Sequence, residues 1–330
     1  MKTKALIALL LLMFASACEV IFDSDMRYLP VRDPTAVVLK NRLVSYTSTE
    51  LVYETDVLLL EIYDGWDNTF LEKEDFVFGG SFKTTVLDFQ RVSSGNTGAS
   101  SSLLLLDASG SYKTTDPYNA RSQAINKFFH DHSPPEDFLL GAFSKNGSLT
   151  GDGVEFYSEH FSSDHEQPTR YLFDLAKRTG GSSSLYDALY KSIDKFDAGN
   201  HRKELVSLVH APDNASSVPW PDVVQKAKAN GVRMHMIGLG SEVSLSSLAA
   251  IAQETGGFFA ACRDEKEMVC VFNQLHRLLN SNMEAYRIRV KVEPPAGTIA
   301  SGLEWMQAIY ITDPQFAYEY NPAYVYLKIP

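Results

Sequence analysis

Between residues 102 and 282, short apolar runs alternate with segments of helical period, and this alternation constrains the fold more than any other feature of the chain. Leu103–Leu106 is continuously apolar, as expected of a strand that is buried on both faces of a sheet. Pro117–His132 follows it with apolar residues at helical spacing, and the two patterns then recur. This order predicts an α/β domain with an open, mostly parallel sheet and helices on both faces.

The individual elements of this domain can be assigned from the same two patterns. The expected strands are Leu103–Leu106, Phe138–Phe143, Val154–Tyr157, Glu204–Val209, Val232–Gly238 and Phe258–Ala261. The expected helices are Pro117–His132, Thr169–Lys177, Leu185–Phe196, Pro219–Ala229, Leu245–Thr255 and Glu265–Asn282.

Strand-like segments lie on both sides of the α/β region. Residues 35–98 contain short runs rich in Val, Leu and Tyr, and they end in a turn-rich boundary before residue 102. Residues 285–330 again contain short strand-like runs. We therefore expect the α/β domain, residues 99–284, to be inserted in or flanked by a small β-sandwich that pairs 35–98 with 285–330.

The first residues have the pattern of an export signal. Lys2 and Lys4 precede an apolar stretch, and small residues lead up to Cys18, so residues 1–17 are expected to be a removed signal peptide. The small residues before Cys18 resemble a bacterial lipobox, which implies a diacylated Cys18, an exported protein and a lipid anchor in a bacterial membrane, with the outer membrane or cell surface favoured. Residues 18–34 would then be a tether. The alternative is ordinary cleavage that leaves Cys18 as a free thiol.

Composition and the absence of certain motifs exclude several classes of function. The 330-residue chain has 30 Lys and Arg against 41 Asp and Glu, a formal charge of −11, and no basic stripe, so nucleic acid is not an expected partner. The sequence has no Gly-x-Ser-x-Gly elbow, no His-Glu-x-x-His or Cys-x-x-Cys zinc pattern and no phosphate-binding loop after Leu106. We therefore do not expect an enzyme.

Two further cysteines fall late in the α/β domain. An oxidising compartment favours a disulfide between Cys262 and Cys270, which would join a strand end to the first turns of the last helix. The alternative is a pair of buried, reduced thiols.

Hydroxyl and carboxylate side chains follow the first buried strand directly. The run is Asp107-Ala108-Ser109-Gly110-Ser111. In open α/β sheets, ligands bind beyond the carboxyl ends of the strands, where this loop would lie. Hard oxygen ligands suit Mg²⁺, Mn²⁺ or Ca²⁺, so a divalent cation is the expected cofactor, with Mg²⁺ or Mn²⁺ favoured.

Five segments in one order place this loop in a wider pattern: Leu103–Ser111, Phe138–Ser144, Gly180–Leu189, Asn230–Gly240 and Glu254–Phe259. In this order they resemble the von Willebrand factor type A domain. The resemblance covers about residues 99–282 and implies a Rossmann-like fold with a metal-ion-dependent adhesion site, where an acidic side chain of a protein partner completes the coordination of the ion. By position it implies that Ser109, Ser111 and Ser183 are direct ligands and that Asp107 acts largely through water.

One position departs from the family's pattern. His210 stands where the family has a second acidic ligand. An imidazole in place of a carboxylate weakens the site for Mg²⁺ and favours a softer ion such as Mn²⁺ or Zn²⁺. Asp213 could turn into the site and restore the lost oxygen, or the domain could bind partners without metal. The resemblance thus implies an adhesion or protein-binding lipoprotein with a variant metal site, and the alternative is a metal-independent envelope scaffold.

Overall fold

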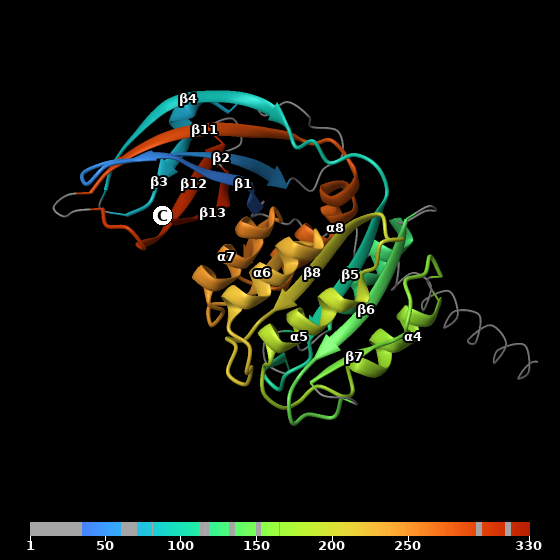
Figure 1. Ribbon diagram of the computed structural model, residues 1–330. Helices are drawn as coiled ribbons and strands as arrows, with labels where there is room; N and C mark the ends of the chain where they lie inside the picture. The colour runs from blue at the N-terminus through green and yellow to red at the C-terminus, as the bar shows by residue number, and fades with distance from the viewer. Residues whose placement is uncertain are drawn as a thin grey trace, which may run out of the picture. The chain divides into compact units, whose positions relative to one another are not determined.

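The computed structural model describes residues 35–330 except for 61–70, 81, 113–115, 117–118, 132–135, 150–152, 165, 295–298 and 314–317 (Figure 1). The described residues belong to one unit, Asp33–Pro330. The predicted signal peptide, the tether and Cys18 lie outside the described residues.

A parallel sheet forms the centre of the α/β region. The order of its strands is β7-β6-β5-β8-β9-β10, in which β7 alone is antiparallel to its neighbour. The strands are β5 (Ser100–Asp107), β6 (Asp137–Phe143), β7 (Val154–Phe156), β8 (Arg202–Val209), β9 (Arg233–Leu239) and β10 (Phe259–Cys262). All eight residues of β5 are buried, as expected of a strand covered on both faces.

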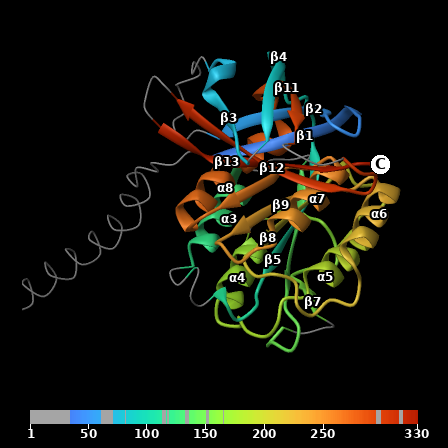
Figure 2. The same ribbon diagram turned by 90° about the vertical axis from the view of Figure 1, so that its left-hand side faces the viewer.

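Helices cover both faces of this sheet. In Figure 2, α3, α4 and α8 lie on one side and α5, α6 and α7 on the other. The helices are α3 (Ala120–Asp131), α4 (Glu166–Leu175), α5 (Leu185–Ser192) with the short η2 (Ile193–Lys195), α6 (Trp220–Asn230), α7 (Leu245–Thr255) and α8 (Glu265–Asn280). The predicted α/β fold class is confirmed. None of the described helices is long and apolar enough to cross a membrane.

The remaining strands come from the two ends of the described chain. They are β1 (Thr35–Tyr46), β2 (Leu51–Leu60), β3 (Phe76–Phe78), β4 (Lys83–Ser93), β11 (Glu284–Glu293), β12 (Glu304–Asp313) and β13 (Tyr318–Lys328), with the short helix η1 (Lys73–Asp75) before β3. β11 pairs with both β2 and β4, and β12 pairs with both β3 and β13. An apolar core fills the space between these strands, and within it the buried Tyr53 donates a hydrogen bond to Gln307 Oε1 at 2.8 Å.

Strand β1 joins the two regions into one continuous sheet. It pairs with β2 along its length, runs parallel to β13 at Thr35 and Asn321, and runs antiparallel to β10 at Val38 and Phe259. The side chain of Gln253 on α7 reinforces the junction, because it donates to the Tyr324 carbonyl at 2.6 Å and accepts from the Tyr326 N–H at 2.8 Å. The β strands therefore cover the edge of the parallel sheet, which the sequence patterns did not predict.

The predicted disulfide is wrong, because Cys262 and Cys270 are both free, buried thiols. Cys262 ends β10, whereas Cys270 lies in α8 with its sulfur 3.9 Å from the Leu60 carbonyl oxygen of β2. Burial raises the pKa of the Cys270 thiol to about 12 and that of Cys262 well above its usual range. Helix α8 is thus held against the β strands by packing.

Candidate functional site

Asp107 is the last residue of β5 and the centre of the predicted site. Its side chain is fully buried, and its Oδ1 accepts a hydrogen bond of 2.8 Å from the Ser109 N–H. The other oxygen, Oδ2, lies 3.1 Å from Nδ1 of His210 and 3.5 Å from the His210 backbone nitrogen. Because β5 and β8 are adjacent and parallel, their carboxyl ends bring Asp107 and His210 together.

The loop after β5 is joined to the loop before α5 by backbone hydrogen bonds. Gly110 N–H donates to the Gly181 carbonyl at 3.1 Å, and Gly180 N–H donates to the Ala108 carbonyl at 2.8 Å. Gly181 has φ +82, and a Cβ there would lie 2.4 Å from the Lys145 carbonyl oxygen, so only glycine fits this approach. The close contact of the two loops brings the serines that follow them to one edge of the sheet.

Three serine hydroxyls belong to these loops. The Oγ atoms of Ser109 and Ser111 lie 3.4 Å apart. Ser183 is buried, and its backbone is fixed by Asn214, whose side chain accepts from the Ser183 N–H at 3.0 Å and whose N–H donates to the Ser183 carbonyl at 3.1 Å. Within the described part of the chain, Ser183 Oγ and both ring nitrogens of His210 are buried without a hydrogen-bond partner. Buried polar atoms without hydrogen-bond partners lower the stability of the fold, and a ligand at this edge could supply those partners.

Two residues that the sequence patterns did not single out support this edge. The Tyr112 ring packs against the His210 imidazole with the two ring centroids 3.8 Å apart. The guanidinium carbon of Arg121 also lies over the Tyr112 ring, 3.6 Å from its centroid. Arg121 also donates to the Asp107 carbonyl at 3.1 Å, and Asp116 accepts from the backbone N–H groups at the start of α3. The position of Tyr112 directly after Ser111 is the one signal that could have marked it; Arg121 has none.

The structure places Asp213 beside the start of α5. Its carboxylate accepts hydrogen bonds from the Tyr186 N–H at 3.1 Å and from the Ser216 N–H at 3.2 Å. The first N–H groups of a helix lack partners within the helix and attract negative side chains, and Tyr186 lies in the first turn of α5. Asp213 therefore holds the start of α5, and its carboxylate oxygens are engaged there by backbone N–H groups.

The charges around Asp107 are unevenly compensated. The buried Arg121 guanidinium lies 3.8 Å from the buried Asp116 carboxylate, so these two charges balance each other. Among the described residues, the group within ion-pair distance of the Asp107 carboxylate is the His210 imidazole. The two are not oriented to form a hydrogen bond with each other. A buried carboxylate is costly unless a cation or metal compensates it.

The donor set fits a first-row transition ion better than Mg²⁺ or Ca²⁺. The described residues hold no group of three or more His, Cys, Asp and Glu side chains, so an ion here would rest on the serine hydroxyls as well as on Asp107 and His210. Mg²⁺ and Ca²⁺ prefer sets of oxygen ligands rich in carboxylates, whereas an imidazole suits Zn²⁺ and its neighbours.

A second buried carboxylate lies at the opposite edge of the sheet. Glu204, near the start of β8, is fully buried and accepts from His235 Nε2 at 2.8 Å and from Arg202 Nε at 2.6 Å, and it also pairs with Arg233. Burial alone would raise the pKa of Glu204, but the hydrogen bonds from His235 and Arg233 outweigh it and lower the pKa to about 2. The cluster is polar, buried and fully partnered.

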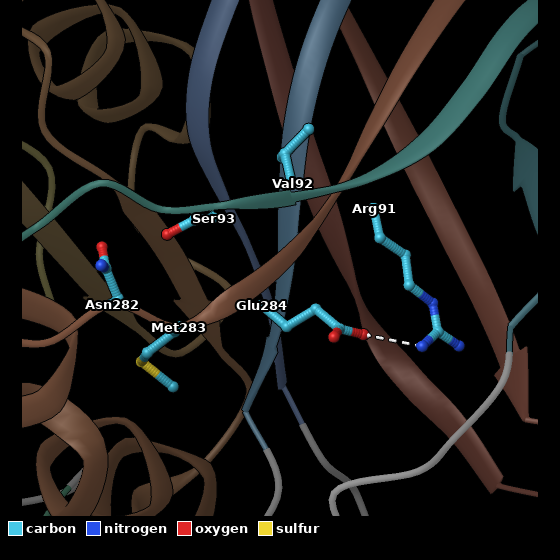
Figure 3. Close-up of a pocket in the computed structure, with 6 residues that line it drawn as sticks. All are labelled: Arg91, Val92, Ser93, Asn282, Met283 and Glu284. Carbon is cyan, nitrogen blue, oxygen red and sulfur yellow. Dashed lines mark ion pairs between the residues drawn. The ribbon is translucent and has the colours of Figure 1, made fainter.

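A shallow cavity of about 340 Å³ opens where β4 ends and β11 begins (Figure 3). Its lining consists of Arg91, Val92, Ser93, Asn282, Met283 and Glu284. An ion pair of 3.2 Å between Arg91 and Glu284 crosses this lining. None of the predicted site residues contributes to the cavity.

No protein-family model and no curated protein matches the chain. Among solved structures, the chain is similar to a von Willebrand factor type A protein from Catenulispora acidiphila, with 10% identity over 90% of this chain and 75% of that one and a TM-score of 0.49. It is similar to the pilus adhesin SpaC from Lactobacillus rhamnosus GG, with 10% identity over 91% of this chain and 48% of that one and a TM-score of 0.46. It is also similar to proximal thread matrix protein 1 from the mussel byssus with a zinc-occupied MIDAS motif, with 15% identity over 61% and 50% and a TM-score of 0.45. These likenesses concern the fold. Five parallel strands with helices on both faces, and the Asp107–Ser111 loop at their carboxyl edge, make this part of the chain an open α/β fold, the class to which these structures belong.

Proposed function

We propose that this protein binds a protein partner through the loops at the carboxyl edge of its parallel sheet. The observation that carries the proposal is a buried group at that edge: beside Asp107, the Ser183 hydroxyl and the His210 imidazole have no hydrogen-bond partner within the described residues. Each such atom lowers stability unless a ligand supplies its missing partner. The proposal assigns binding and no catalysis.

Site-specific photo-crosslinking tests which edge meets the partner. A photoreactive amino acid is placed at Asn146 after β6 and, in a second variant, at Ser217 after β8; both positions are exposed. The matched control is Asn230, an exposed position at the end of α6 and beside the start of β9. We expect one shared adduct from Asn146 and Ser217 in cells and no such adduct from Asn230. The same adduct from all three positions, or from Asn230 alone, would contradict the proposal.

We further propose that the protein acts as an exported lipoprotein anchored through Cys18. The support is the sequence pattern of residues 1–18, in which a basic start, an apolar stretch and small residues precede the cysteine. Metabolic labelling with an alkyne analogue of palmitate should label the protein, and Cys18→Ala should abolish the label. Label retained by Cys18→Ala would exclude this anchor, without bearing on the crosslinking result.

A further inference from the structure

We infer that His210 is a nitrogen ligand of a divalent transition ion and that this edge of the sheet therefore prefers Zn²⁺ or Mn²⁺ to Mg²⁺ and Ca²⁺. The ion would lie on the surface proposed for partner binding, so its role in recognition rests on that proposed function. The proposed ligands are Asp107, His210 and the hydroxyls of three serines, Ser109, Ser111 and Ser183.

The geometry of the His210–Asp107 contact is the first support. Nδ1 of His210 lies 3.1 Å from Oδ2 of Asp107, yet the imidazole makes no hydrogen bond to any described residue. Two atoms that bind one ion at about 2.0–2.2 Å and at roughly a right angle lie about 3 Å apart, with both lone pairs directed at the ion rather than at each other. The pair therefore has the separation of ion ligands and lacks the direction of a hydrogen bond.

Charge is the second support. The Asp107 carboxylate is fully buried. Arg121 donates to the backbone carbonyl of Asp107, but the guanidinium charge of Arg121 is balanced by Asp116. A divalent ion would compensate the carboxylate that the protein's own cations leave uncompensated.

The hydroxyls supply the remaining ligands. Ser183 Oγ is buried and has no hydrogen-bond partner within the described residues, and Ser109 and Ser111 place two more hydroxyl oxygens 3.4 Å apart in the adjoining loop. The Tyr112 ring, 3.8 Å from the imidazole, fixes the orientation of His210. A first-row ion accepts this mixture of one imidazole and several oxygens, whereas Mg²⁺ and Ca²⁺ gain little from the nitrogen.

Calorimetric titration of the full-length protein in detergent, after chelation and dialysis, measures the preference directly. ZnCl₂, MnCl₂, MgCl₂ and CaCl₂ are titrated separately. We expect one site that binds Zn²⁺ and Mn²⁺ at least about ten-fold more tightly than Mg²⁺, and Ser183→Ala should weaken that site. Absence of binding, or equal affinity for all four ions, would overturn the assignment.

Two variants locate the site. His210→Asp should lower the ratio of Zn²⁺ to Mg²⁺ affinity by at least about ten-fold, because it exchanges the nitrogen for a hard oxygen. His160→Gln is the matched control, since His160 is exposed and lies on another loop. Loss of zinc binding in His160→Gln with an unchanged ratio in His210→Asp would place the ion elsewhere and overturn the assignment.

Pulsed electron paramagnetic resonance decides the case in which His210→Asp fails to fold. Mn²⁺ bound to the unaltered protein should show modulation from a directly coordinated imidazole nitrogen, and its absence would overturn the assignment. The crosslinking adduct from Asn146, formed with and without chelator, separates the two proposals. An adduct that persists without ion leaves the partner-binding surface in place while removing the ion from recognition.

Discussion

The two edges of the parallel sheet each bury a carboxylate beside a histidine, but the hydrogen bonding of the two pairs differs. At the amino edge, Glu204 lies 2.8 Å from His235 and is also bound by Arg202 and Arg233. At the carboxyl edge, Asp107 lies 3.1 Å from His210, and the imidazole nitrogens make no hydrogen bond to the described residues.

The difference separates a structural cluster from the proposed binding site. The Glu204 cluster also ties down the chain around it, because Arg202 donates to the Thr97 carbonyl at 2.6 Å and to Asn280 Oδ1 at 3.1 Å. Those contacts hold the segment before β5 to the end of α8. Beside Asp107, the His210 imidazole and the Ser183 hydroxyl have no hydrogen-bond partner within the described residues, and proteins tolerate such local losses of stability at functional sites.

The largest expected effect is that of removing the structural carboxylate. Glu204→Ala leaves two guanidinium groups and an imidazole beside a buried gap, so the free energy of unfolding should fall by about 3–5 kcal/mol. The control is Glu159→Ala, because the Glu159 side chain is 86% exposed in its pair with Lys195. That change should cost less than about 1 kcal/mol in urea-induced unfolding. Similar losses in the two variants would remove the distinction between the edges.

The pH dependence of stability should follow the same carboxylate. The pKa of Glu204 is about 2 in the folded protein, against an ordinary value of 4.5, so its contribution is complete above 4.5 and is lost as the pH falls toward 2. The difference in unfolding free energy between the unaltered protein and Glu204→Gln should thus stay constant from neutral pH to about 5 and narrow below it. Urea unfolding at a series of pH values measures this difference, and a gap that widens in acid would contradict the assigned shift.

A matched pair of serines compares the two kinds of buried hydroxyl. Ser207 is fully buried on β8, and its hydroxyl donates to the Leu105 carbonyl at 3.3 Å, whereas the Ser183 hydroxyl has no hydrogen-bond partner within the described residues. Ser207→Ala should destabilise the ion-free protein by about 1 kcal/mol, and Ser183→Ala should leave it unchanged or stabilise it by about 1 kcal/mol. Thermal unfolding in chelator gives both values. Equal destabilisation by the two changes would mean that Ser183 is partnered after all.

The smallest expected effect is that of reductant. Cys262 and Cys270 are free and buried with raised thiol pKa values, so dithiothreitol should not change the melting temperature. Alkylation followed by mass measurement should modify these two thiols only after unfolding. A melting temperature lowered by reductant would contradict the assignment of Cys262 and Cys270 as free thiols.

Regular elements were the part of the fold that sequence patterns predicted best. The bounds expected for Leu245–Thr255 are those of α7, because Gly256 ends it with φ +80. The strand expected at Leu103–Leu106 proved longer at both ends, since the serines before it and Asp107 after it are also buried in the sheet. Local periodicity indicates an element's type, but burial by distant neighbours sets its length.

The positions of the predicted site residues, as distinct from their role as ligands, were predictable only where they followed from a strand end. Asp107, Ser109 and His210 could be placed because adjacent parallel strands end at one edge. The role of Asp213 could not be predicted, because it depends on the unpaired N–H groups of α5. Arg121 was missed for a similar reason, since its partners Tyr112 and Asp107 meet it only after folding.

Strand β1 has a mechanical consequence. Inter-strand hydrogen bonds run across the strands, and β1 is bonded to β2, β10 and β13 within the first few residues of the described chain. A pull on the chain ahead of Thr35 acts along β1, so it loads these bonds together in shear instead of opening them one at a time. A force between the chain before Thr35 and a partner at the carboxyl edge of the sheet would therefore be borne by β1, which pairs with three other strands.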